Sequence, residues 1–91
     1  MDKALILAKA AITVGEVPIG ALVVKDGKII GQGHNRTRID KDPTAHAEIV
    51  AIRQATRFTG NDRLEDCDLW VTLEPCTMCA GAIAHARIRR L

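Results

Sequence analysis

Two closely spaced cysteines are the feature of this sequence with the clearest chemical potential. Cys76 and Cys79 lie in the stretch LEPCTMCAGA, and the first of them directly follows a proline. Residues at positions i and i+3 face the same side of a helical turn, and the free amides of a helix N-terminus favour thiolates. Such a pair can close a disulfide, exchange electrons, hold a structural metal, or supply half of a catalytic zinc shell.

The cysteine count and the apolar pattern narrow these options. The chain holds three cysteines, an odd number, which fits a reducing compartment better than a disulfide framework. No apolar run is long enough to span a bilayer, and the apolar part of MDKALILAKA is too short for a secretory signal. We therefore expect a cytoplasmic protein with no membrane partner, in which Cys76 and Cys79 bind metal or act in redox chemistry.

The other residues able to complete a metal shell are few: Cys67, His34, His46 and His85. Cys67 is separated from Cys76 by most of a predicted strand, and His85 lies about 9 Å further along the predicted helix of Cys79. Neither can readily join the pair. His46 is the better third ligand, because it opens a helix that follows a strand pair, and strand-to-helix turns gather at one edge of an α/β sheet.

Glu48 follows His46 closely in TAHAE, where it can lean over the open position of a metal for proton transfer rather than ligation. Three protein ligands leave a fourth position for water, whose pKa zinc lowers towards neutrality. A structural zinc site would need a fourth protein ligand, and His34 is the one residue that could swing in. A thioredoxin-type redox pair needs no His-x-Glu and does not explain one.

The first half of the chain predicts a helix and a hairpin. Helix formers over residues 2–14 predict an amphipathic helix, and its packing face is expected to contain Leu5, Ala8 and Ile12. The dipeptide Asp26-Gly27 is a strong two-residue turn signal, and β-branched runs flank it. Antiparallel strands are expected at about 21–25 and 28–32.

The second half predicts two more helices around a strand. Thr44 is the expected N-cap of a helix through AHAEIVAIRQATRF, and a strand is expected at about 68–73. Pro75 fits the N1 position of a helix through CTMCAGAIAHA, after which RIRRL resembles the start of another strand. This order predicts one α/β domain with a sheet between helices, and a right-handed parallel crossover at its last step.

Charge and aromatic residues do not by themselves indicate a nucleic-acid partner. The net charge of +2 is too small to announce phosphate binding, which normally requires a clustered excess of lysine and arginine. Trp70 and Phe58 fall within a predicted strand and a predicted helix, so they are expected in the core rather than as a stacking platform for bases.

Two motifs together carry a family resemblance. HAE at residues 46–48 and PCTMC at residues 75–79 resemble the zinc-dependent cytidine/deoxycytidylate deaminase superfamily. The stretches EVPIGALVV, GHNRT, DPTAHAEI and VTLEPCTMCAGAI resemble its bacterial tRNA-specific adenosine deaminase branch over nearly the whole chain. The resemblance implies a three-layer α-β-α fold and a single zinc deaminase domain over residues 1–91. That family's domain continues further, so it also implies a fragment or an unusually short member, without the final strands.

The resemblance implies a zinc hydrolase that converts adenosine to inosine at the wobble position of tRNA anticodons. One Zn²⁺ per chain would be bound by His46, Cys76 and Cys79. Glu48 would accept a proton from the metal-bound water, and would then protonate the ring nitrogen and the departing amine. The implied partners are the tRNA anticodon loop and a second copy of the chain in a homodimer.

The resemblance also implies contacts to the base. Asn35 would hydrogen-bond the base edge with help from the backbone of Ala47, and the pocket wall would contain Val17, Leu73, Glu74 and Pro75. Two alternatives stay open. One is a guanine or cytosine deaminase that acts on a free base with the same zinc chemistry, and the other is a non-catalytic module stabilised by zinc.

Overall fold

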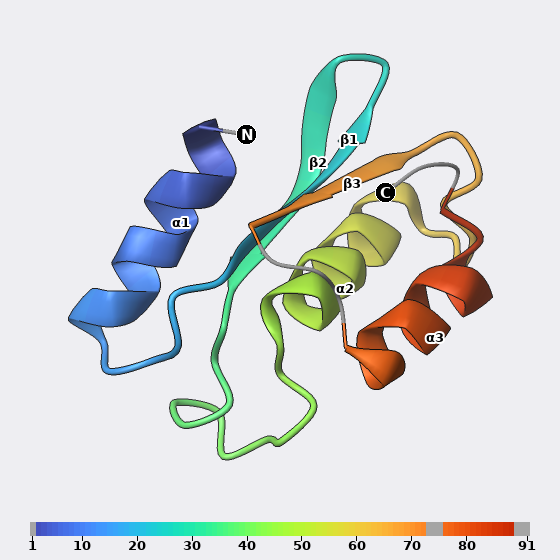
Figure 1. Cartoon of the computed structure of the whole chain (residues 1–91). Coiled ribbons are helices and arrows are strands. Elements are labelled where there is room, and N and C mark those ends of the chain that lie inside the picture. The colour runs from blue at the N-terminus through green and yellow to red at the C-terminus, as the bar shows by residue number, and fades with distance from the viewer. Residues whose placement is uncertain (1, 73–75, 89–91) are drawn as a thin grey trace.

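The computed structural model describes residues 2–72 and 76–88, which form a three-stranded sheet with helices on both faces (Figure 1). The elements in chain order are α1 (Asp2–Thr13), β1 (Gly20–Lys25), β2 (Lys28–His34), α2 (Ala47–Thr59), β3 (Asp68–Val71) and α3 (Thr77–Ala86). One face of the sheet is covered by α1, and the other by α2 and α3 (Figure 1). The expected three-layer α-β-α arrangement is confirmed.

The sheet has the strand order β2-β1-β3, and β1 runs antiparallel to both neighbours. The first residues of β1 therefore pair with the last residues of the outer strands: Gly20 lies opposite His34, and Ala21 lies opposite Val71. It follows that β2 and β3 point in the same direction and end at one edge of the sheet. The predicted crossover into another strand falls on residues outside the described part of the chain.

The hairpin between β1 and β2 is confirmed. Asp26 and Gly27 have φ angles of 52° and 76°, the pair of positive values that a type I′ turn requires. The second strand continues past its predicted end at residue 32 as far as His34, which brings the strand directly to the loop before α2.

The predicted packing face of α1 was right for Ala8, which is buried, but wrong for Leu5 and Ile12. Leu5 and Ile12 are 49% and 58% exposed, whereas the buried side chains within residues 3–13 are those of Ala4, Ala8 and Ala11. The reason is the close approach of the helix to β1. A Cβ placed on Gly20 would collide with the carbonyl oxygen of Ala4, so nothing larger than alanine fits between helix and strand.

The opposite face of the sheet packs equally closely against α2. A Cβ on Gly31 of β2 would overlap the carbonyl oxygen of Ala51 and would lie 2.9 Å from the Cβ of Ala55. A Cβ on Gly33 would lie 2.6 Å from Cγ1 of Val50. The main core lies in this layer, where the buried cluster includes Ala21, Val23, Ala51, Ile52, Ala55, Leu64, Cys67 and Leu69.

Several local predictions also needed correction. The N-cap of α2 is His46 rather than Thr44, because the Thr44 amide and hydroxyl donate to the Asp42 carboxylate at 2.9 and 2.7 Å. The N-cap of α3 is Cys76, so N1 is the next residue, and Pro75 itself lies outside the described residues. The strand β3 ends at Val71.

The two aromatic side chains were expected in the core, and this prediction was wrong. Trp70 is 42% exposed and Phe58 is 74% exposed. Strand alternation buries Leu69 against the helices and turns Trp70 to the other face. Within residues 2–72 and 76–88, no helix is long and apolar enough to cross a membrane.

The close packing of α2 on β2 predicts that Gly31→Ala lowers the free energy of unfolding by about 1–3 kcal/mol, because the added methyl group meets backbone atoms that cannot move aside. Gly81→Ala is the matched control. Gly81 lies within α3, and no atom of the described residues lies within 4 Å of a Cβ added to it, so this change should raise the free energy of unfolding by about 0.5–1 kcal/mol. Urea denaturation of the metal-loaded proteins measures both. Equal effects of the two substitutions would contradict the close packing.

Candidate metal and catalytic site

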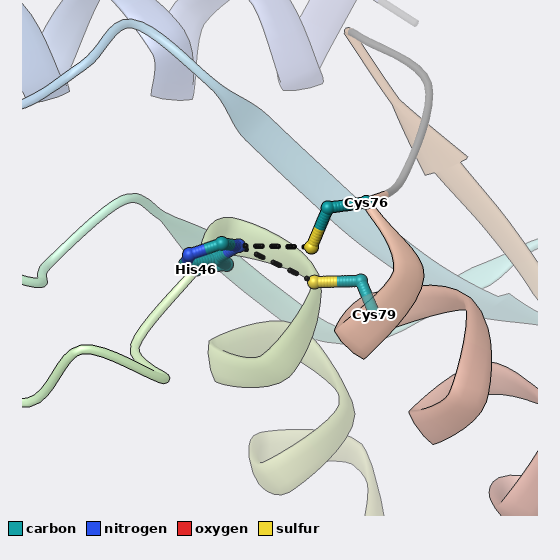
Figure 2. Close-up of side chains that lie close together, drawn as sticks. All are labelled: His46, Cys76 and Cys79. Atoms are coloured by element: carbon teal, nitrogen blue, oxygen red, sulfur yellow. Dashed lines mark hydrogen bonds between the residues drawn. The ribbon is translucent and has the colours of Figure 1, made fainter.

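The candidate site lies where α2 and α3 begin, at the sheet edge reached by the ends of β2 and β3. His46 is the N-cap of α2 and Cys76 is the N-cap of α3, and Cys79 lies in the first turn of α3. N-cap side chains usually bond the free amides of their own helix, but the His46 side chain makes no such cap bond. The side chains of His46, Cys76 and Cys79 face each other across the gap between the helix ends (Figure 2).

The donor atoms have a spacing that fits one metal ion. Nδ1 of His46 lies 3.5 Å from Sγ of Cys76 and 3.5 Å from Sγ of Cys79, as the dashed lines in Figure 2 show. The three atoms lie within 4.8 Å of one another. Neighbouring corners of a tetrahedral zinc site are about 3.6 Å apart, given bonds of about 2.0–2.3 Å to nitrogen and sulfur. One imidazole nitrogen and two thiolates are therefore both chemically and geometrically suited to zinc.

The two thiols differ in their affinity for a proton. The backbone N–H of Cys79 donates to the Cys76 sulfur and lowers the pKa of Cys76 below its ordinary value. Burial, followed by the negative charge of Glu48, raises the pKa of Cys79 to about 12. Without a cation, therefore, Cys79 keeps its proton at neutral pH. A dication would relieve this repulsion among neighbouring anionic groups, so uptake of a metal should release protons.

Glu48 has the environment of a group that exchanges protons. It lies in the first turn of α2, is 4% exposed, and its charge is, after burial, the second cause of the raised pKa of Cys79. Its Oε1 atom is buried and has no hydrogen-bond partner among the described residues. A buried carboxylate oxygen without a donor is costly. This oxygen is therefore free to bond a water or substrate bound beside the cluster.

Asn35 differs from an ordinary loop asparagine. Its side chain is 5% exposed and makes no hydrogen bond to any residue that the structure describes, while its backbone amide donates to the carbonyl of Ile19 at 3.2 Å. The usual role of such a residue, a turn closed by its own side chain, is therefore not what Asn35 performs. Its amide group remains available to a ligand.

The structure describes two of the other residues that were predicted to contact the base. Ala47 is fully buried at the start of α2, and Val17 is 52% exposed beyond the end of α1. The three remaining predicted pocket residues lie outside the described part of the chain: Leu73, Glu74 and Pro75.

None of the other cysteine and histidine residues considered as ligands joins the cluster among the residues described. Nδ1 of His34 lies 2.8 Å from the carbonyl oxygen of Asn35, which engages the one side chain considered as a fourth ligand. Cys67 is buried in the core, and His85 is in the last turn of α3. Among the residues described, His46, Cys76 and Cys79 form the one group of three spaced to hold a metal.

One residue near the site escaped the sequence analysis. Glu16 is only 6% exposed, and its carboxylate accepts hydrogen bonds from the loop between β2 and α2. The available signal was weak: a single acidic residue between Gly15 and the apolar run that leads into β1.

Comparison with known proteins identifies the relatives of this chain. A tRNA-specific adenosine deaminase of Agrobacterium fabrum is 57% identical over 91 residues, which cover 100% of this chain and 60% of the relative. A tRNA-specific adenosine deaminase of Haemophilus influenzae is 54% identical, over 100% of this chain and 53% of the relative. The chain thus spans little more than half the length of these curated relatives.

Solved structures agree with the fold. A structure from work on A-to-I editing by tRNA:A34 deaminases at the wobble position of transfer RNA has a TM-score of 0.95 and 56% identity, over 97% of this chain and 68% of that chain. A guanine deaminase from Bacillus subtilis has a TM-score of 0.94 and 46% identity, over 98% and 57%. The resemblance to the tRNA-specific adenosine deaminase branch and the cytidine-deaminase-like fold are both confirmed. The model of the MafB19-like deaminase family matches residues 1–91, and the chain therefore belongs to this family of deaminases.

Proposed function

We propose that residues 1–91 form a single zinc deaminase domain that converts adenosine to inosine at the wobble position of tRNA anticodons. The observation that carries the proposal is the cluster of His46, Cys76 and Cys79 beside a buried Glu48 oxygen that has no hydrogen-bond partner among the described residues. The tRNA substrate rests on the names of relatives at 57% and 54% identity. A cytoplasmic location and a homodimer are further parts of the same proposal.

The proposed roles follow from the donor atoms. His46, Cys76 and Cys79 would hold one zinc ion per chain, and bound zinc would supply the Lewis acidity that makes water nucleophilic near neutral pH. Glu48 accepts a proton from the attacking water at its unpaired oxygen. It passes that proton to N1 of the adenine ring and then moves the second proton of the water to the amine, which leaves C6 as ammonia. The oxygen stays on C6, so the product is inosine.

Substrate contacts form the next part of the proposal. The buried Asn35 amide, which lacks a side-chain partner among residues 2–72 and 76–88, would bond the edge of the base, and the backbone of Ala47 would assist. Val17 would form part of the pocket wall. The remaining proposed wall residues are Leu73, Glu74 and Pro75. A base splayed out of an anticodon loop can enter such a pocket without opening a duplex.

A second candidate function is hydrolytic deamination of a free base such as guanine. It is favoured by the TM-score of 0.94 with the guanine deaminase from Bacillus subtilis, since the same zinc chemistry serves either substrate. A non-catalytic module is less well supported, because a structural zinc site does not need the buried Glu48 oxygen, which has no partner within residues 2–72 and 76–88.

Mass spectrometry separates these candidates. The zinc-loaded protein is incubated with an anticodon stem-loop RNA that carries a wobble adenosine, and separately with free guanine and free cytosine. The proposal predicts inosine at the wobble position and no change in either free base. Conversion of a free base alone would replace the proposed substrate, and no conversion of any substrate would count against the catalytic role of this chain.

Glu48→Gln tests the proton-transfer role. Glutamine keeps the size of the side chain but cannot accept and return a proton, so we expect turnover to fall by about 10²–10⁴-fold. Zinc content should stay the same. Glu65→Gln is the matched control, because Glu65 is an exposed residue paired with Arg63 on the surface. Undiminished turnover in the Glu48 variant would remove this residue from the mechanism.

Alkylation by iodoacetamide tests the metal ligands. In the zinc-free protein Cys76 should react first, since it is exposed and its pKa is lowered, while the buried Cys67 and Cys79 react slowly. Zinc should slow the reaction of Cys76 several-fold, and peptide mass spectrometry follows each site. In His46→Ala this protection should weaken. A rate at Cys76 that zinc leaves unchanged in the unsubstituted protein would contradict the assignment.

A further inference from the structure

Three polar or charged side chains are buried among the residues that the structure describes, namely Glu16, Asn35 and Glu48. Glu48 and Asn35 already have proposed roles with the proton and with the base. Glu16 has none, although burying a carboxylate is unfavourable unless hydrogen bonds compensate for the lost hydration. The partners of Glu16 therefore indicate what its burial achieves.

The backbone around Glu16 is tied to the end of α1. Its amide donates to the carbonyl of Ala11 at 2.9 Å, next to Gly15, whose φ of 77° reverses the chain after the helix. Since α1 packs closely on β1, the helix and the sheet together fix the backbone position of Glu16.

The carboxylate reaches across to the loop between β2 and α2. Its Oε2 accepts the backbone N–H groups of Arg38 at 3.0 Å and Ile39 at 2.8 Å. Its Oε1 accepts the Arg38 N–H at 3.3 Å and the Thr37 hydroxyl at 3.5 Å. Hydrogen bonds to an ionised acceptor are about twice as strong as neutral ones. Glu16 thus binds two consecutive backbone amides of the loop. Another connection of the loop is the more exposed ion pair of Asp42 with Arg53 of α2, at 3.7 Å.

That loop connects two parts of the candidate site. It begins after Asn35, whose backbone N–H donates to the carbonyl of Ile19, and it ends at Ala45 and His46. The two ends of the loop are joined where the Arg36 N–H donates to the Ala45 carbonyl at 2.9 Å. Within the loop the Arg36 guanidinium donates hydrogen bonds to the Asp40 carboxylate. This pair lies within the loop, so it shapes the loop without fixing its position. Glu16 supplies the connection to the sheet and α1.

We propose that Glu16 is a positioning residue: its carboxylate holds the 36–42 loop against the end of α1 and thereby keeps Asn35 in place to bind the base. The effect of Glu16 on substrate binding rests on the proposed function above, whereas its hydrogen bonds to the loop do not. Glu16 touches none of the proposed reacting atoms in this account. It acts on affinity for the base, through Asn35, rather than on the chemical step.

Amide hydrogen exchange, followed residue by residue by NMR on the zinc-loaded protein, tests the hold on the loop without any substrate. In Glu16→Ala the amides of Arg38 and Ile39 should exchange about tenfold faster or more, while amides within β1 and β2 keep their protection. Glu16→Gln should fall between, because one amide oxygen can still accept from both N–H groups. Unchanged protection of Arg38 and Ile39 in Glu16→Ala would overturn the proposal.

Steady-state deamination of the anticodon stem-loop RNA tests the consequence for substrate. Glu16→Ala should raise KM about tenfold with a much smaller change in kcat and no change in zinc content, and Glu16→Gln should recover part of the loss. Glu65→Ala is the control and should leave both constants unchanged. A purely structural role would lower the amount of active protein, hence kcat, at constant KM, and that result would overturn the proposed link to the base.

A double substitution tests the route through Asn35. If Glu16 acts by holding Asn35, adding Glu16→Ala to Asn35→Ala should raise KM little further, whereas fully additive effects would contradict this route. Absence of deamination by the unsubstituted protein would count against the proposed function. The hydrogen-exchange experiment would still test whether Glu16 holds the loop, because it needs no substrate.

Discussion

The antiparallel pairing of β1 with both of its neighbours is the constraint on which the site depends. Because β2 and β3 each run against β1, they end at the same edge of the sheet, and the helices that follow them begin there. His46 precedes Cys76 by 30 positions and Cys79 by 33 positions in the chain. The shared edge nevertheless brings its imidazole within 3.5 Å of both sulfur atoms. Without this pairing the two motifs would have no reason to meet.

Close packing turns this shared edge into a defined geometry. Glycine in β2 and alanine in α2 let the helix backbone lie directly on the strand, as glycine in β1 does for α1 on the other face. Such contacts leave little freedom for a helix to slide or rotate. The N-terminus of α2, and with it His46, is consequently set by backbone contacts rather than by large side chains that could repack.

The buried polar groups lie at positions where the cost of burial is balanced by a role in or near the candidate site. The three that the described residues contain lie at the site or are tied to the loop leading to it. Glu48 has a buried oxygen with no partner within the described ranges, whereas Glu16 is fully engaged with backbone amides. This contrast separates a carboxylate suited to exchanging protons from one suited to holding a loop.

Much of the site could be predicted from sequence because cysteine spacing, turn residues and strand direction follow local rules. The meeting of His46 with the cysteine pair required only that two strand-to-helix turns share an edge. The packing face of α1 could not be predicted this way. Alanine rather than leucine faces the sheet there, because Gly20 lets the helix approach β1 closely. The exposure of Trp70, the capping role of His46 and the loop contacts of Glu16 likewise depend on tertiary neighbours that no short window reveals.

X-ray absorption at the zinc edge of the metal-loaded protein identifies the ligands of the metal. We expect two sulfur ligands at about 2.3 Å and two nitrogen or oxygen ligands at about 2.0–2.1 Å, and we expect His46→Ala to remove the imidazole ligand. A shell with a third sulfur, which would require Cys67, or a shell that His46→Ala leaves unchanged, would contradict the site described for His46, Cys76 and Cys79.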